Sequence, residues 1–152
     1  MAKVPVYLTC GEKRAQYILV NGITGSCALE GISDRDFFEE REKCSFAWLS
    51  LEQARHSEFG HVIFEVRVNP EVVYVADLSA ACDLFTKGAL LTGEARELRR
   101  VEYVKIYRRT IQRLSEYLTK GNINPEEVEI IIANPVSPKD ITFIERRPLH
   151  HL

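Results

Sequence analysis

A short apolar stretch near the carboxyl end, residues 128–133, constrains the fold of this chain more than any other segment. It reads Val-Glu-Ile-Ile-Ile-Ala, and β-branched runs of this length favour a buried strand. Pro135 and Pro138 follow it, and because proline cannot donate to a sheet ladder, they predict a tight loop after the strand. Glu129 is the acidic residue in this strand, so a buried position would require a partner or a task for its carboxylate.

Further strands and helices alternate irregularly along the rest of the chain. The strand candidates are residues 4–9, 45–49, 61–68, 72–75 and 141–144. The helix candidates are residues 12–20, 50–58, 77–87 and 93–120, the last long enough to be two helices. Ser50 and Gln53 have the spacing of a capping box. Strands at both ends and in the middle, with helices of unequal length between them, predict an α+β fold rather than regular βαβ repetition.

The segment from Gly22 to Lys43 has no clear period, contains three glycines and becomes acidic towards its end. Ordinary connections have a median length of about five residues, so this one is too long to be a simple link. We expect a binding loop or lid with a short helix inside it. A solvated excursion is the alternative.

Length and composition indicate one globular domain. At 152 residues, with 45% hydrophobic residues and a formal charge of −2, the chain can bury a sizeable core and has no overall attraction for polyanions. We expect a single domain over residues 1–145 and a tail over residues 146–152. No apolar run reaches the length of about 18 residues that a membrane helix needs, and no secretory signal is evident, so we expect a cytoplasmic protein with no membrane partner.

The four cysteines and four histidines do not show the spacing of a metal site. Cys10, Cys27, Cys44 and Cys82 match neither a zinc motif nor a small disulfide framework, which predicts reduced thiols. The histidines are also unsuitably spaced, so no metal is expected: His56, His61, His150 and His151. Phosphate-binding Gly-rich loops and the Gly-x-Ser-x-Gly elbow are absent from the sequence, which leaves kinase, Rossmann and hydrolase functions without support.

Three segments together resemble the split nicotinamide-binding core of the ADP-ribosyltransferase family. Val6-Tyr7-Leu8-Thr9 and the helix that follows, Ala15 to Ile23, are similar to the family's first strand and helix. Ala47-Trp48-Leu49-Ser50 is similar to a later strand that leads into a serine-capped helix, and Glu129-Ile-Ile-Ile is similar to the strand that opens with the catalytic glutamate. A compact chain of this kind is most similar to bacterial ADP-ribosyltransferase toxins that modify DNA or RNA, and to RNA 2′-phosphotransferase relatives.

The resemblance implies a split pair of small sheets with flanking helices and a cleft that binds NAD as substrate. Glu129 would hold the 2′-hydroxyl of the nicotinamide ribose and stabilise the positive charge that develops as the glycosidic bond breaks. The residues that would contact the dinucleotide are Tyr7, Thr9, Lys13, Arg14, Trp48 and Ser50. The family often has a histidine where this chain has Leu8, and Leu8 cannot hydrogen-bond a ribose.

Each of these assignments has a simpler structural alternative. Glu129 can alternate with Glu127 to the solvent face of an edge strand. Tyr7 and Trp48 can be ordinary core aromatics, and Ser50 needs no role beyond capping its helix.

The predicted function is NAD-dependent ADP-ribosyl transfer to a nucleic-acid or protein acceptor, as a toxin that an antitoxin partner would neutralise. Basic residues on the long helix could contact the nucleic acid, or form a solvated face: Lys105, Arg108, Arg109 and Arg113. The alternatives are a nucleotide- or nucleic-acid-binding module that has lost the chemistry, and a small nuclease toxin.

Overall fold

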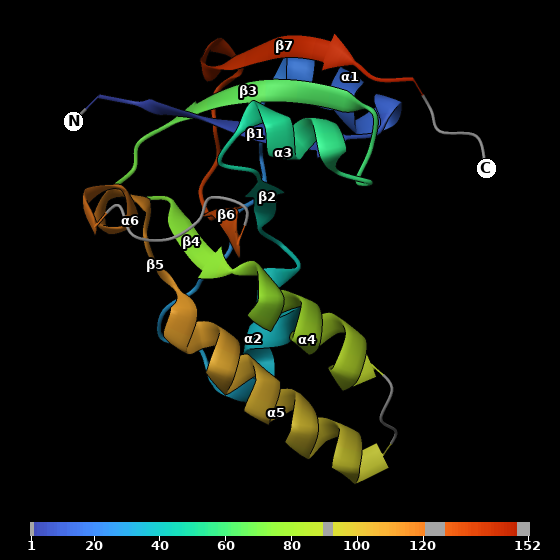
Figure 1. The fold of residues 1–152 in the computed structure, drawn as a ribbon, viewed down its shortest axis with the longest axis vertical. Coiled ribbons are helices and arrows are strands. Elements are labelled where there is room, and N and C mark those ends of the chain that lie inside the picture. The colour runs from blue at the N-terminus through green and yellow to red at the C-terminus, as the bar shows by residue number, and fades with distance from the viewer. Residues whose placement is uncertain (1, 90–92, 121–126, 149–152) are drawn as a thin grey trace.

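The computed structural model describes residues 2–89, 93–120 and 127–148 (Figure 1). They form two small antiparallel sheets with helices around them, which confirms the predicted α+β class and its pair of sheets. The helices and strands occur in this order: β1 (Val4–Cys10), α1 (Glu12–Asn21), α2 (Asp34–Arg41), β2 (Ser45–Ala47), α3 (Leu51–His56), β3 (Val62–Val68), β4 (Tyr74–Asp77), α4 (Leu78–Ala89), α5 (Gly93–Thr110), β5 (Gln112–Arg113), α6 (Leu114–Lys120), β6 (Val128–Ile132), η2 (Pro138–Asp140) and β7 (Ile141–Arg146).

The first sheet has the order β1-β3-β7, and so joins the two ends of the chain. In Figure 1 it lies at the top, with α1 behind it and α3 in front. The last strand runs two residues beyond the predicted end at residue 144, and Arg147 continues the pairing by donating its backbone N–H to His61. Residues 149–152 of the predicted tail lie outside the described residues.

The second sheet has the order β2-β6-β4-β5. Its central strand β6 is buried on both faces, which explains its nearly continuous apolar sequence. Val128, Ile130 and Ile132 pack against the first sheet and α1, whereas Ile131 faces the layer of α2, α4 and α5. Glu129 has the same strand parity as Ile131, so its side chain enters the helical layer.

The helix predicted over residues 93–120 is two helices with a strand between them. Arg113 pairs with Tyr74 at the edge of the second sheet, and Leu114 donates its backbone N–H to Val73. This edge pairing turns the chain between α5 and α6, so a single apolar stripe does not continue through both helices. Tyr107 and Leu114 are fully buried, whereas Leu118 is 46% exposed.

Cys27 and Cys44 form a disulfide, so the prediction of reduced thiols is wrong for this pair. The second sheet brings them together: Cys44 precedes Ser45, which pairs with Ile132 at the end of β6, and Cys27 donates its backbone N–H to Ala133, the next residue along the chain. The proximity therefore depends on strand pairing between distant segments, which cysteine spacing does not encode. Cys10 and Cys82 are free thiols.

None of the helices in the described part of the chain is both long enough and apolar enough to span a bilayer.

Candidate functional site

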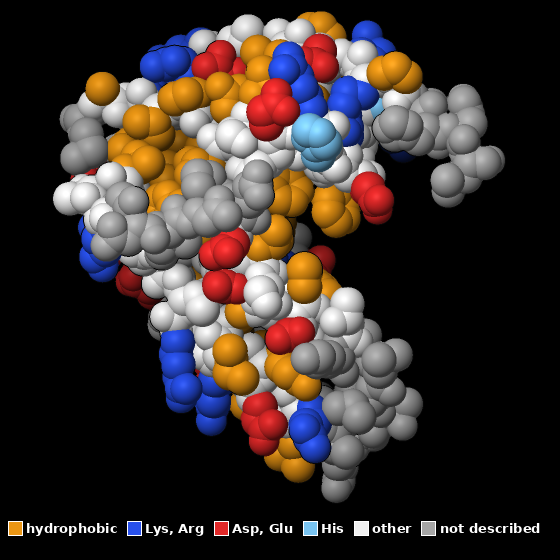
Figure 2. All heavy atoms as spheres, viewed as in Figure 1, with side chains coloured by type: hydrophobic (Ala, Val, Ile, Leu, Met, Phe, Trp, Pro, Cys, Tyr) orange, Lys and Arg blue, Asp and Glu red, His pale blue; other side chains and the backbone are white. Residues whose placement is uncertain are grey.

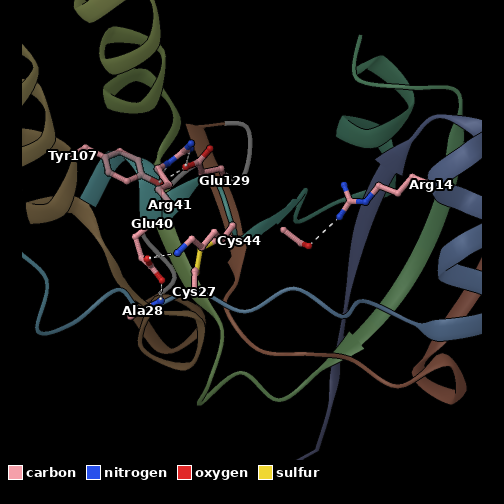
Figure 3. The surroundings of a disulfide bond; sticks show 10 residues. Arg14, Cys27, Ala28, Glu40, Arg41, Cys44, Tyr107 and Glu129 are labelled. Atoms are coloured by element: carbon pink, nitrogen blue, oxygen red, sulfur yellow. Dashed lines mark hydrogen bonds and ion pairs between the residues drawn. A yellow bond between two sulfur atoms is a disulfide. The ribbon is translucent and has the colours of Figure 1, made fainter. Parts of the chain in front are cut away.

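Glu129 lies in a buried polar cluster on the helical side of the second sheet, together with Arg41 of α2 and Tyr107 of α5 (Figure 3). Glu129 is only 7% exposed. β6 is a central strand, with β2 on one side and β4 on the other, so the alternative of a solvent-facing carboxylate on an edge strand is wrong.

Both partners bind the same oxygen of the carboxylate. The Arg41 guanidinium donates to Glu129 Oε1 at 2.7 Å, and the Tyr107 hydroxyl donates to the same atom in a short hydrogen bond. Arg41 Nε also donates to the Tyr107 oxygen at 3.0 Å, which closes the triangle. Such charge-assisted contacts fix the orientation of a carboxylate and offset the cost of burying it.

The second oxygen, Glu129 Oε2, accepts no hydrogen bond from any residue that the structure describes. Oε2 is also not fully enclosed, because Arg147 Nε is the fully enclosed side-chain atom without a partner among the described residues. The cluster therefore orients the carboxylate through one oxygen and leaves the other for an additional donor.

Aromatic rings surround the Arg41 guanidinium. Its central carbon lies 4.2 Å from the ring centre of Phe46, 4.6 Å from that of Phe85 and 5.0 Å from that of Tyr107. Burial is the largest influence and would lower the pKa of Arg41, but the electrostatic interactions with Glu129 and Tyr107 and the hydrogen bonds to both residues together outweigh it. The pKa of Arg41 therefore lies above its ordinary value. Burial, and then the charge of Glu129, raise the pKa of Tyr107 far above its ordinary value. Arg41 is therefore charged and Tyr107 is protonated at neutral pH.

Two of the predicted cleft residues, Tyr7 and Trp48, meet where the two sheets join. Tyr7 donates its N–H to the Trp48 carbonyl at 2.8 Å, and Trp48 returns the bond at 2.7 Å. Ala47, the residue before Trp48, pairs with Ile130, which follows Glu129. The strand that carries Glu129 is therefore connected to β1 through residues 47 and 48.

Figure 2 shows the surface hollowed between the first sheet with α3 and the end of the molecule that carries α4. The β2–α3 connection carries Trp48 and Ser50. Both residues are half-buried.

The capping role of Ser50 is confirmed. Its hydroxyl accepts the backbone N–H of Gln53, whose side chain accepts the N–H of Ser50, which completes the capping box of α3. Ser50 nevertheless remains half-buried.

The remaining predicted NAD contacts are less closely gathered. Arg14 reaches from α1 to the Ser45 hydroxyl at 3.0 Å, and Figure 3 shows it well apart from the Glu129 cluster. Lys13 is exposed on α1, and Thr9 is half-buried on β1. Leu8 is fully buried in the aliphatic core between the sheets, so its position faces that core and not the solvent.

The four basic residues predicted to bind nucleic acid differ in their surroundings. Arg108 is tied to the segment 22–43: it donates to Leu29 and Ile32 carbonyls and to Asp34. Lys105 and Arg109 are exposed on α5, and Arg113 is exposed on β5, 3.9 Å from Glu71.

A cavity of about 430 Å³ lies beside Arg108, and Tyr74, Ile111, Arg113 and Glu116 also line it. Glu129 is not part of its lining. Among the residues that the structure describes, no group of three or more His, Cys, Asp or Glu side chains is placed to hold a metal ion.

Arg41 and Tyr107 carry no signal of this role in the sequence. Tyr107 stands in a long helical segment, and Arg41 is one basic residue in an acidic stretch. A buried acidic residue implies a basic partner, but the sequence does not show which of the 20 lysines and arginines supplies it.

Comparisons of this chain with models of protein families, with curated proteins and with solved structures gave no match.

Proposed function

We propose that this protein transfers ADP-ribose from NAD to a nucleic-acid or protein acceptor, with Glu129 as the catalytic carboxylate. The observation that carries the proposal is the asymmetric environment of that side chain. Arg41 and Tyr107 hold Oε1, while Oε2 has no donor among the described residues. A ribose 2′-hydroxyl is a donor that suits Oε2.

The chemistry accounts for this arrangement. Departure of nicotinamide leaves positive charge on the ribose, and a carboxylate fixed in advance stabilises that charge without first having to reorient. Arg41 and Tyr107 supply the fixed orientation from α2 and α5. In this proposal Trp48 and Tyr7, at the junction of the sheets, offer aromatic surface for the planar bases, and Ser50 offers a half-buried hydroxyl.

The test is NAD turnover by the purified protein, comparing Glu129→Gln with Glu127→Gln. Glutamine keeps the size of the side chain but loses its charge, so we expect turnover to fall by about a hundredfold or more. Glu127 is exposed and lies two residues away, so its variant is the matched control and should retain full turnover. Unchanged turnover in Glu129→Gln, with its fold verified by circular dichroism, would sink the assignment.

The second candidate is a module that binds a nucleotide without cleaving it. The burial of Leu8 favours this alternative, because the first strand then offers no polar side chain at that position. The ion pair between Arg41 and Glu129 also neutralises the charge that catalysis would use. Titration calorimetry separates the two: NAD binding without cleavage supports the module, and binding followed by nicotinamide release supports the transferase.

As a transferase or as a module, the protein is proposed to work in the cytoplasm, with an antitoxin as partner if it acts as a toxin.

A further inference from the structure

The segment that supplies Arg41 to the carboxylate is closed into a ring by a disulfide. Cys27 and Cys44 are 17 positions apart, and the ring between them contains all of α2. Arg41 is three residues from the cross-link, and its carbonyl accepts the backbone N–H of Cys44 at 3.0 Å. Figure 3 shows the disulfide beside Arg41 and Glu129.

We propose that Cys27 is a site of thiol–disulfide exchange, and that reduction of its bond to Cys44 loosens α2 and withdraws Arg41 from Glu129. Oxidation would then assemble the candidate site and reduction would disassemble it. The inference about the catalytic consequence rests on the proposed function, whereas the loosening of α2 does not.

The disulfide is accessible from one side. Cys27 is half-buried and lines a cavity of about 220 Å³, together with Leu29, Tyr74 and Asn134. Cys44 is only 8% exposed. Thiol–disulfide exchange requires access to the sulfur that is attacked, so the geometry selects Cys27 as the entry point.

The exchange takes place with a dithiol reductant in two steps. One thiolate of the reductant attacks Cys27 Sγ, the bond to Cys44 breaks, and Cys44 leaves as a thiolate. The second thiol of the reductant then attacks the reductant's own sulfur that is bonded to Cys27 Sγ, and Cys27 is released. Two electrons pass to the cystine, the two protons of the dithiol end on the two cysteines, and the reductant becomes a cyclic disulfide.

The other contacts of the ring explain why the cross-link matters for Arg41. Towards its beginning the ring is held by Arg108, which binds Leu29, Ile32 and Asp34. Towards its end, Arg41 binds Glu129 and Tyr107, Glu40 accepts the N–H of Ala28 within the same ring, and Phe38 packs against Phe85 of α4. Loss of the cross-link therefore leaves the end of α2 attached to the helical layer through Arg41 and the packing of Phe37 and Phe38.

The chain-entropy account gives the size of the effect. A cross-link over a loop of this length favours the closed arrangement by roughly a hundredfold, and less where the ends are already held by a sheet. We therefore expect local opening of α2 to become about tenfold more frequent on reduction.

The experiment compares the full chain, air-oxidised or treated with dithiothreitol, by hydrogen exchange and by NAD turnover. Peptide mapping first verifies the Cys27–Cys44 cross-link in the oxidised protein. We expect exchange in residues 34–43 to accelerate by about tenfold on reduction, while β1 and β3 are unchanged, and NAD turnover to fall by about fivefold or more.

Two variants serve as matched controls. Cys82→Ser removes an exposed free thiol and should respond to the reductant as the unmodified protein does. Cys27→Ser/Cys44→Ser should behave as reduced protein without any reductant; if it does not fold, the dithiothreitol comparison still decides.

Equal exchange of α2 in the two states would overturn the proposal, as would free Cys27 and Cys44 thiols in the oxidised protein. Faster exchange with unchanged turnover would overturn the link to Glu129. If NAD is not turned over in either state, the proposed function fails, and the exchange of α2 alone then supports or overturns the redox control.

Discussion

At the scale of single residues, one buried carboxylate organises three distant parts of the chain. Glu129, Arg41 and Tyr107 come from β6, α2 and α5 and meet at one oxygen atom. Removing one member of such a cluster costs more than the contact itself contributes, because the remaining groups stay buried without partners. The cluster is therefore at once a structural element and the candidate site.

Tyr107 should be the last of the six tyrosines to ionise. Burial and the charge of Glu129 raise its pKa in the folded state above the unfolded value of about 10. The contribution of the Tyr107 phenol to the free energy of unfolding is therefore fully present below about pH 10. It is lost as the pH rises further, because the unfolded state releases the proton more readily.

The measurement is the ultraviolet absorbance of phenolate against pH, followed together with unfolding. We expect one tyrosine fewer to titrate in Tyr107→Phe, and its stability to decline less steeply above about pH 10. Removal of the hydroxyl should also cost about 1–3 kcal/mol at neutral pH. If all six phenols of the unmodified protein ionise before unfolding, the burial of Tyr107 is refuted.

At the scale of elements, side chains at helix ends and in connections hold the site together. The segment 22–43 contains the predicted short helix and is fastened to α5, so it is not the freely solvated excursion that was the alternative. Arg108 is the fastening residue. The basic helix therefore has a structural face as well as an exposed one.

Arg108→Ala and Arg109→Ala form a matched pair that separates these faces. Arg108→Ala removes three hydrogen bonds to the loop, so we expect faster hydrogen exchange in residues 29–34 and a loss of about 1–3 kcal/mol of stability. Arg109→Ala should leave the hydrogen exchange of this loop unchanged and the stability within about 0.5 kcal/mol, because the Arg109 side chain is exposed. Equal effects of the two substitutions would contradict the assignment.

Ser50→Ala tests the capping box of α3. We expect a loss of about 1 kcal/mol in denaturant unfolding, because the N–H of Gln53 loses its acceptor. Ser79→Ala, an exposed serine in the first turn of α4, is the control and should cost less than about 0.5 kcal/mol. A loss of NAD affinity in Ser50→Ala beyond its loss of stability would indicate contact with the ligand as well.

At the scale of the whole molecule, Glu12 connects the beginning of the chain to its end. It accepts hydrogen bonds from Arg146 at the end of β7, and its Oε1 lies 3.1 Å from Nε2 of His61. The hydrogen bond from Arg146, followed by that from His61, lowers the pKa of Glu12. The folded state thus binds this proton less readily than the unfolded state.

This shift predicts a specific loss of stability in acid. The contribution of Glu12 to the stability of the fold is present above the pKa of about 4.3 that a glutamate has in the unfolded state. It is lost as the pH falls through the lower pKa of the folded state. We expect Glu12→Gln to flatten part of the decline in thermal stability below about pH 5, measured against Glu58→Gln, an exposed carboxylate. Lys3 lowers the pKa of Asp140 in the same way, so part of the decline should persist. Identical acid profiles for both variants would exclude the contribution of Glu12.

Local patterns were enough to predict most of the elements. Alternation and β-branching placed β1, β3 and β6, and the Ser50–Gln53 spacing placed the start of α3. These signals depend on neighbours within one or two turns, so the sequence contains them directly. The sequence also determined that Glu129 would be an acid inside an apolar strand.

Only the tertiary structure decided which residues meet that acid. Arg41 is 88 positions away from Glu129, and Cys27 reaches Cys44 because β2 pairs with β6. The sheet edge at β5 likewise ended α5, although the helical pattern continued beyond it. Contacts of this kind depend on how strands from distant segments pair, and no spacing along a single chain records that choice.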